Sequence, residues 1–243
     1  MAKRLIGGLL AAALLAGGTG WCAERKSVGA AVFVSGDVKL RRPGTSGYPQ
    51  LQAGERLYLG DIVETGVGAK ASVVLLYGSE IRLNENTILE LIAGKKKGDA
   101  ARLARGQVWT RMLHKRGGLD IRTVTAICAV RGTEADIEQL QALTVKVYEG
   151  HVDVENAAGM VSLKAGEMTS VSGAAAAPVK AAKMKPAEFG KWQDGVTSKD
   201  IMSFLEQLQA SPGGDKKLRF NVGELGKSDK DVRIKLKKKD GAE

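Results

Sequence analysis

Residues 71–91, ASVVLLYGSEIRLNENTILEL, decide the fold class of this chain. The run 71–77 is rich in β-branched and apolar residues, which predicts a buried strand. Gly78-Ser79-Glu80 then predicts a turn, and residues 81–83 alternate apolar and polar as a half-exposed strand does. Because a further short strand is expected at 87–91, the whole stretch is expected to fold as strand after strand.

The same pattern extends over residues 28–172. Segments 32–34 and 38–40 predict a hairpin-like unit bent at Ser35-Gly36-Asp37. No helix of ten or more residues is expected, and even 133–141 is expected to continue from a strand into a loop. A glycine followed by a polar residue and an apolar strand recurs at irregular spacing, which predicts repeated turns, at Gly36, Gly54, Gly60, Gly106, Gly150 and Gly166. The prediction is an all-β fold, a β-solenoid-like or rolled sheet of short strands, with a small C-terminal helix and tail.

The charge of the chain is unevenly distributed. The 243 residues hold 37 Lys and Arg against 27 Asp and Glu, a net charge of +10. Residues 1–23 carry only two basic residues, residues 24–173 carry 20 basic and 17 acidic residues, and residues 174–243 carry 15 and 10. The β body is therefore nearly balanced and gives no indication of nucleic-acid binding. Two cysteines and two histidines cannot build a disulfide framework or a His-rich metal site.

The N-terminus has the pattern of a secretory signal peptide. Lys3 and Arg4 precede a twelve-residue apolar run at 5–16, and no second segment of spanning length follows. We expect residues 1–23 to be a signal peptide and the mature protein to be periplasmic or secreted. Two alternatives stay open: an uncleaved anchor in the inner membrane, and a lipoprotein attached through Cys22, although the preceding residues lack the Leu of a lipobox.

Several motifs over roughly residues 30–172 resemble the FecR-type periplasmic domain family. The most specific is Val130-Arg131-Gly132-Thr133, and the others lie at 34–38, 51–66, 69–83, 145–152 and 163–167. Where the family usually has Thr-Pro, this chain has Thr123-Val124, a departure that affects one turn. The matching motif residues, which we expect to be structural, are Gly60, Asp61, Thr65, Gly66, Gly78, Ser79, Arg131, Gly132, Thr133, Gly150 and Gly166.

The resemblance implies a fold more firmly than a role. FecR proteins proper are inner-membrane regulators, in which a cytoplasmic helical segment controls a sigma factor and a periplasmic domain senses an outer-membrane receptor. Only four residues precede the apolar run here, so we expect no sigma-binding segment. The resemblance therefore implies a stand-alone exported copy of the β domain.

The chain contains no recognisable catalytic motif. Asp37, Asp61 and Glu167 follow turn glycines, where a carboxylate that caps the turn is the ordinary explanation, and Asp120 is the fourth acid considered. Neither His114 nor His151 has a Cys or His partner at metal-ligand spacing, and Cys128 lies in an apolar stretch typical of a buried structural thiol. We expect no catalytic residue, no cofactor and no metal.

Arg131 is the best single candidate for a special role. Its apolar surroundings predict a partly buried cation, which needs a carboxylate or carbonyl partner. Whether it forms a structural ion pair or recognises a ligand stays open. Lys95, Lys96 and Lys97 are expected to form a solvated turn tip.

The C-terminal part is expected to be a linker, a helix and a basic tail. Residues 174–196 form an Ala/Lys/Pro-rich linker, and residues 197–243 form the helix and tail. The helix is predicted over 197–209, with Thr197 or Ser198 as N-cap, and docks on the β body or on a partner with one apolar face, Ile201, Phe204, Leu205 and Leu208. Residues 231–239 alternate apolar and basic, as in a solvated edge strand or a segment attracted to an anionic envelope surface.

These features together predict an exported, non-enzymatic binding or scaffold module of the bacterial cell envelope. The expected partner is an envelope protein or a cell-wall glycan, with an anionic surface as a further partner of the C-terminal tail and no nucleic acid. The alternative is a periplasmic sensor component of a sigma/anti-sigma signalling relay.

Overall fold

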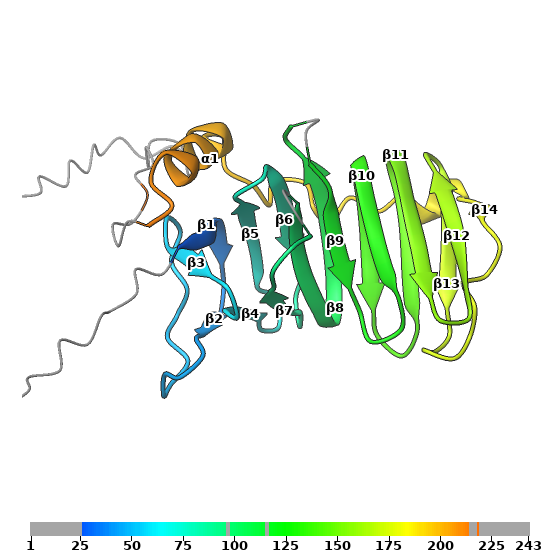
Figure 1. The fold of residues 1–243 in the computed structure, drawn as a ribbon, viewed down its shortest axis with the longest axis horizontal. Coiled ribbons are helices and arrows are strands. Elements are labelled where there is room, and N and C mark those ends of the chain that lie inside the picture. Colours follow the sequence, from blue (N-terminus) through cyan, green and yellow to red (C-terminus); the bar gives the residue numbers. More distant parts are fainter. Residues whose placement is uncertain (1–25, 96–97, 115–116, 214–217, 219–243) are drawn as a thin grey trace, which may run out of the picture.

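The computed structural model describes residues 26–95, 98–114 and 117–213 together with residue 218 (Figure 1). The signal peptide predicted at 1–23 and the alternating segment 231–239 lie outside these residues. The elements are β1 (Ser27–Ser35), β2 (Val38–Arg41), β3 (Arg56–Tyr58), β4 (Ile62–Thr65), β5 (Lys70–Leu75), β6 (Ser79–Leu83), β7 (Ile88–Leu91), β8 (Asp99–Met112), β9 (Leu119–Arg122), β10 (Ile127–Gln139), β11 (Leu143–Asn156), β12 (Gly159–Lys164), β13 (Glu167–Val171), β14 (Ala182–Lys183), the 3₁₀ helix η1 (Pro186–Glu188) and α1 (Ile201–Ala210).

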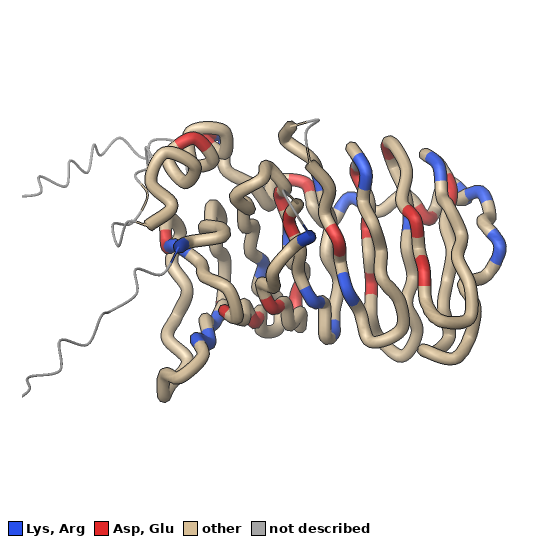
Figure 2. The backbone as a smooth tube through the Cα atoms, viewed as in Figure 1, with Lys and Arg blue, Asp and Glu red and all other residues tan. Residues whose placement is uncertain are grey.

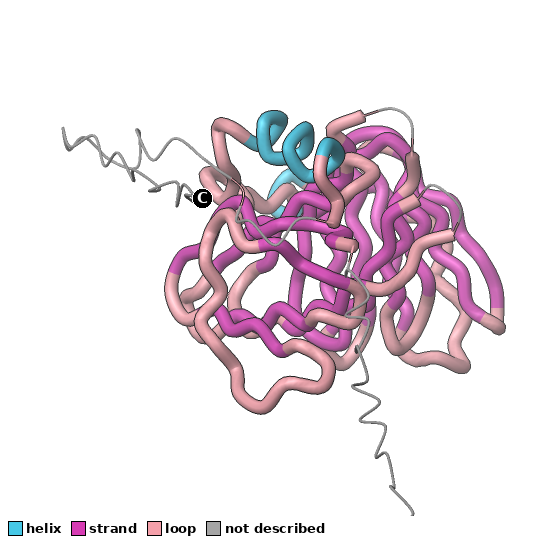
Figure 3. Tube along the Cα trace, turned by 60° about the vertical axis from the view of Figure 1, so that its left-hand side comes forward, coloured by secondary structure: helices cyan, strands magenta, loops and turns pink. Residues whose placement is uncertain are grey.

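The strands form one sheet that folds over on itself into a flattened, barrel-like roll (Figures 1 and 3). Its first layer contains β3, β1, β5, β6, the second halves of β8 and β10, the first half of β11, β13 and β14. The second layer contains β2, β4, β7, the first half of β8, β9, the first half of β10, the second half of β11 and β12. The prediction of an all-β fold with a small C-terminal helix is thus confirmed, whereas a solenoid is not confirmed.

Glycines stand where the three long strands pass from one layer to the other. Gly106, Gly132 and Gly150 have φ angles of +102°, +69° and +75°, a backbone region that residues with a Cβ atom rarely adopt. At position 106 an added Cβ would lie 2.4 Å from Thr87 Oγ1, so this corner also needs the small size of glycine. The recurring glycine–polar pattern therefore includes the corners of the roll.

The segment predicted as a hairpin at residues 32–40 is a corner between the two layers. β1 pairs with β3 and β5, whereas β2 pairs with β4, and no pairing joins β1 to β2 among the described residues. Gly36 makes the corner with a φ of +79° and packs against Ala69. The hairpin prediction was wrong. Two short strands joined by a glycine bend have the same sequence pattern in a hairpin, where the two strands pair, and in a corner, where the chain passes to the other layer.

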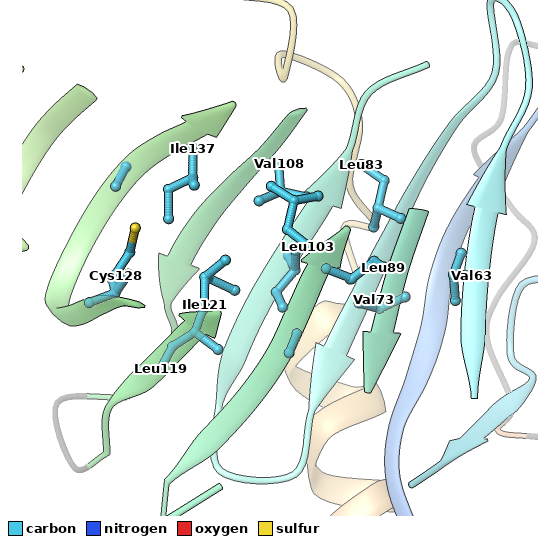
Figure 4. Packing of buried hydrophobic residues seen from close by; sticks show 14 of the residues in the cluster. Val63, Val73, Leu83, Leu89, Leu103, Val108, Leu119, Ile121, Cys128 and Ile137 are labelled. Carbon is cyan, nitrogen blue, oxygen red and sulfur yellow. The ribbon is translucent and has the colours of Figure 1, made fainter. Parts of the chain in front are cut away.

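Apolar side chains that point between the layers form the main core. Figure 4 shows Val63, Leu89, Leu103 and Ile121, contributed by successive strands, among the residues packed there. Cys128 belongs to this core and is fully buried, and burial raises the pKa of its thiol to about 12. The prediction of a buried structural cysteine is confirmed.

Helix α1 docks on the outer side of the first layer, over β1 and β5 (Figure 1). Its predicted apolar face is confirmed and forms a second buried cluster with Ala30, Val32 and Val74. The predicted N-cap was wrong: Asp200 occupies that position, while the Thr197 hydroxyl donates a hydrogen bond to a buried carboxylate of the sheet. No helix in the described part of the chain is long and apolar enough to cross a membrane.

The chain between β13 and α1 runs back along the sheet. Val179 N–H donates to Ser170 O over 2.9 Å, and β14 pairs with β13. Residues 190–197, which we call the strap, continue over the outer side of the first layer. There Lys70 Nζ donates to Trp192 O over 3.0 Å, and Arg82 donates to Gln193 O over 2.9 Å. The Ala/Lys/Pro-rich segment 174–196 thus lies against the β body along much of its length.

Candidate interaction surface

Acidic residues after turn glycines hold the turns closed. Gly60 has a φ of +83°, and Asp61 Oδ2 accepts the Tyr58 N–H over 3.0 Å. Gly166 has a φ of +80°, and Glu167 Oε2 accepts the Lys164 N–H over 2.8 Å. The turn-capping prediction is therefore confirmed for both acids. Of the other two acids considered, Asp37 pairs with Lys39 at 3.4 Å, and Asp120 lies on β9.

Thr65 and Gly66 join β4 to the neighbouring loops. Thr65 Oγ1 donates to Asn84 O over 2.6 Å and accepts the Thr87 N–H over 2.9 Å. The Gly66 N–H donates to Asp37 O over 2.8 Å. Both residues therefore stabilise the loops next to β4 through hydrogen bonds.

The turn between β5 and β6 surrounds a buried acid and ends at Gly78, so Ser79 and Glu80, which were predicted to lie in the turn, instead begin β6. The Tyr77 and Ser79 N–H groups donate to the two carboxylate oxygens of Asp99, over 3.0 and 3.1 Å. Burial raises the pKa of Asp99 to about 6, although these hydrogen bonds oppose the rise. Gly78, with a φ of +92°, lies against His114.

Arg131, Gly132 and Thr133 lie at the corner of β10. Gly150 lies at the corner of the neighbouring strand β11, and Gly166 lies beside it in the β12–β13 turn. The Arg131 side chain is 48% exposed, and its nearest carboxylate oxygen, on Asp120, is 3.9 Å away. It thus has a carboxylate partner as predicted, but it is more exposed than predicted. His151 pairs across the ladder with Arg131 at the same corner.

A buried charge cluster lies under the strap. Glu80, fully buried on β6, accepts hydrogen bonds from Ser72 Oγ at 3.0 Å, Arg82 Nε at 3.0 Å and Thr197 Oγ1 at 2.6 Å. Arg111 adds a contact at 2.8 Å. Burial alone would raise the pKa of Glu80, but the hydrogen bonds from Arg82 and Thr197 and the two guanidinium charges outweigh it and lower the pKa.

A second buried acid attaches the strap to β10. Trp192 Nε1 donates to Asp136 Oδ2 over 2.6 Å, and Gln107 Nε2 donates to both oxygens of the same carboxylate. Burial is the largest effect on Asp136 and raises its pKa. The sequence pattern singled out neither Glu80 nor Asp136, and it placed Glu80 in a predicted turn. These two acids, like the buried Asp61 and Asp99, are held by groups of the fold.

Exposed apolar residues gather at two neighbouring turns. Val124 in the β9–β10 turn and Leu140 in the β10–β11 turn are 64% and 55% exposed. The turns are tied together because Thr125 Oγ1 donates to Gln139 Oε1 over 2.9 Å. Ile127, at the start of β10, is 40% exposed.

Two arginines border these apolar side chains. Arg122 is the ladder partner of Ile127, and its Nε is buried without a hydrogen-bond partner. Arg105 and Leu140 line a shallow hollow of about 640 Å³. We call Arg105, Arg122, Val124, Ile127 and Leu140 the turn-tip patch.

Comparison with known proteins finds a family match for part of the chain. Residues 61–153 match the family model described as FecR protein, the family that the sequence motifs resemble. Two similar crystal structures come from Parabacteroides distasonis ATCC 8503, each of a "putative anti-sigma factor". One has 14% identity and a TM-score of 0.48 and covers 60% of this chain and 74% of its own. The other has 17% identity and a TM-score of 0.48 and covers 61% and 72%. No curated protein matches the sequence.

Proposed function

We propose that this protein is a non-enzymatic binding module of the bacterial cell envelope, and that it binds an envelope protein through the turn-tip patch. The observation that carries the proposal is the patch itself, in which Val124, Ile127 and Leu140 stand exposed beside Arg105 and Arg122. Apolar side chains grouped with arginine are typical of protein interfaces, where arginine is enriched and apolar residues occupy the centre.

The patch also indicates the chemistry of the partner. Neighbouring Arg102 on β8 is paired with Glu90, so its charge is already balanced. Arg122 beside it forms no ion pair among the described residues. A carboxylate on the partner would balance the charge of its guanidinium, and a partner apolar side chain would cover Leu140.

The buried acids support a non-enzymatic role. Glu80 and Asp136 are held by the strap and by neighbouring strands, and Asp99 by two backbone N–H groups. Each carboxylate therefore has a structural function that accounts for its burial.

A second candidate function is that of a periplasmic sensor in a sigma/anti-sigma signalling relay, which the FecR domain at residues 61–153 favours. Deleting the gene would then change transcription of one sigma-dependent set of genes, and a neighbouring sigma-factor gene would be expected. An unchanged transcriptome would exclude the relay and leave the binding module in place.

Affinity capture from envelope extracts tests the binding module. The intact protein is expected to retain a defined envelope protein, and Leu140→Asp is expected to lose it. Met202→Asp, on the exposed side of α1, serves as the matched control and is expected to retain it. Equal capture by all three proteins would refute the turn-tip patch as the binding site. Capture of cell-wall glycan alone would refute the proposal that the partner is a protein.

A further inference from the structure

The second layer of the roll ends in a strand with a free edge. β12 pairs antiparallel with β11 from His151–Lys164 to Asn156–Gly159, and no strand of the described chain pairs with its other side (Figure 1). The first layer ends differently, because β14 and Val179 cover the corresponding edge of β13.

The orientation of the β12 backbone follows from two hydrogen bonds. Ala165 N–H donates to Gly150 O, on the β11 side, whereas Lys164 N–H donates to Glu167 Oε2, away from β11. Because peptide groups alternate in direction along a strand, the N–H and C=O groups of Ser162 and Met160 also face away from β11. These groups are placed to accept another strand.

Several lysines lie at the same end of the roll as this edge. Lys164 on β12 is exposed, and so are Lys180, Lys183 and Lys185 on the chain that follows β13. Figure 2 shows Lys and Arg at this end of the roll. Among the described residues none of these four ammonium groups forms an ion pair.

Three nearby acids accept hydrogen bonds within the fold: Glu167 and Glu188 each accept a backbone N–H, and Asp153 accepts the Ser162 hydroxyl. A fourth, Glu155 on β11, is exposed as the ladder partner of Met160. Because none of the four lysines forms an ion pair with these acids, their ammonium groups remain able to pair with carboxylates of a partner.

We propose that the free edge of β12 takes an extended, acidic segment of a partner protein as an added antiparallel strand. The backbone groups of Met160 and Ser162 would bind the segment, and the lysines would select carboxylates on it. A second copy of this chain fits less well, because its own lysines would approach those of the first copy. This site is separate from the turn-tip patch and does not depend on it.

The test uses the full chain and two peptides of alternating pattern that carry fluorescein on the N-terminal amine, fluorescein-TEVEVET-amide and its lysine counterpart fluorescein-TKVKVKT-amide. Fluorescence polarisation is expected to show binding of the acidic peptide only. Ser162→Pro removes an N–H that faces the free edge and leaves the ladder with β11 intact, so it is expected to weaken binding at least tenfold. Ser162→Ala keeps the N–H and is expected to bind within twofold of the original protein.

Two further measurements separate edge pairing from charge attraction. Hydrogen exchange at the Met160 and Ser162 amides is expected to slow when the acidic peptide binds. The double change Lys180→Gln with Lys183→Gln is expected to weaken binding several-fold and to reduce its dependence on salt.

Three results would overturn the proposal. These are equal binding to Ser162→Pro, no binding of the acidic peptide, and self-association of the unbound protein that Ser162→Pro abolishes. The second result would mean that the lysines only keep the edge unpaired.

Discussion

Replacing Glu80 by glutamine is expected to destabilise the fold while barely changing its packing volume. The carboxylate is fully buried and binds Arg82, whose side chain is 6% exposed, and Arg111, whose side chain is 33% exposed. Removing one partner of a buried ion pair leaves an uncompensated charge and costs about 3–5 kcal/mol. Most of this cost is expected to come from Arg82, because water partly screens the Arg111 charge.

Urea unfolding followed by tryptophan fluorescence measures this cost. With a slope of about 2 kcal/mol per molar urea, the midpoint is expected to fall by about 1.5–2.5 M. Glu149→Gln makes the same chemical change at an exposed position on β11 and is expected to shift stability by less than about 0.5 kcal/mol.

The pH dependence gives a second readout for Glu80. Its pKa is lowered in the folded state from the usual 4.5, so its stabilising contribution is present above that pH and is lost as the pH falls through the folded pKa. Glu80→Gln is expected to flatten this acid-side loss of stability. Equal unfolding midpoints for Glu80→Gln and Glu149→Gln would refute the role assigned to the buried cluster.

Three other predictions concern single positions. Gly106→Ala is expected to lower the free energy of thermal unfolding by more than about 2 kcal/mol, because the added Cβ would meet Thr87. Gly44→Ala has open space around it and is expected to lose only roughly 1 kcal/mol, the cost of a left-handed backbone. Equal losses would contradict the close approach of Gly106 to Thr87. The pKa of Asp99 is raised to about 6, so its charged form is disfavoured in the fold. Its contribution to the unfolding free energy therefore falls by about 3 kcal/mol as the pH rises from about 4 to above 6. Asp99→Asn is expected to remove that fall, and a pH profile of stability that the substitution leaves unchanged would contradict the raised pKa. Iodoacetamide followed by peptide mass mapping is expected to modify Cys128 only after unfolding, and labelling of the folded protein would contradict its burial.

The sequence predicted many of the strands because they are either runs of β-branched and apolar residues, as in β5, or segments in which apolar and polar residues alternate. It could not predict which layer a strand joins. The glycine bend at Ser35-Gly36-Asp37 has the same composition as a hairpin turn, but the chain crosses there to the other layer. Whether the chain forms a hairpin or crosses to the other layer depends on which distant strands pair with it, and the local composition does not indicate that pairing.

The buried charge cluster was missed for a related reason. Arg82 lies on the outer face of β6, where alternation predicts contact with water, and Glu80, on the same face, was predicted to lie in the preceding turn. Thr197 and Gln193 cover them from more than a hundred residues away along the chain. The composition of the strap gave no indication that it would pack there.

The turn-tip patch was not predicted either. Val124 and Leu140 lie in two different turns, so they share no periodic pattern. The corner of β10 at Gly132 brings the turns together, and the hydrogen bond between Thr125 and Gln139 joins them. Arg131 was the residue favoured for a special role, yet its side chain is half exposed beside Asp120. The apolar neighbours of Arg131 in the sequence are the same whether its side chain is exposed at a corner or buried in a strand, so they could not distinguish the two.

Site-specific photo-crosslinking in living cells tests the central claim most directly. A photoreactive amino acid is placed at Val124 or Leu140 in the turn-tip patch, and at Met202 on α1 as the control. We predict that both patch positions capture the same envelope protein and that Met202 does not. Capture from Met202 with none from Val124 or Leu140 would contradict the proposal that this protein binds its partner through the turn-tip patch.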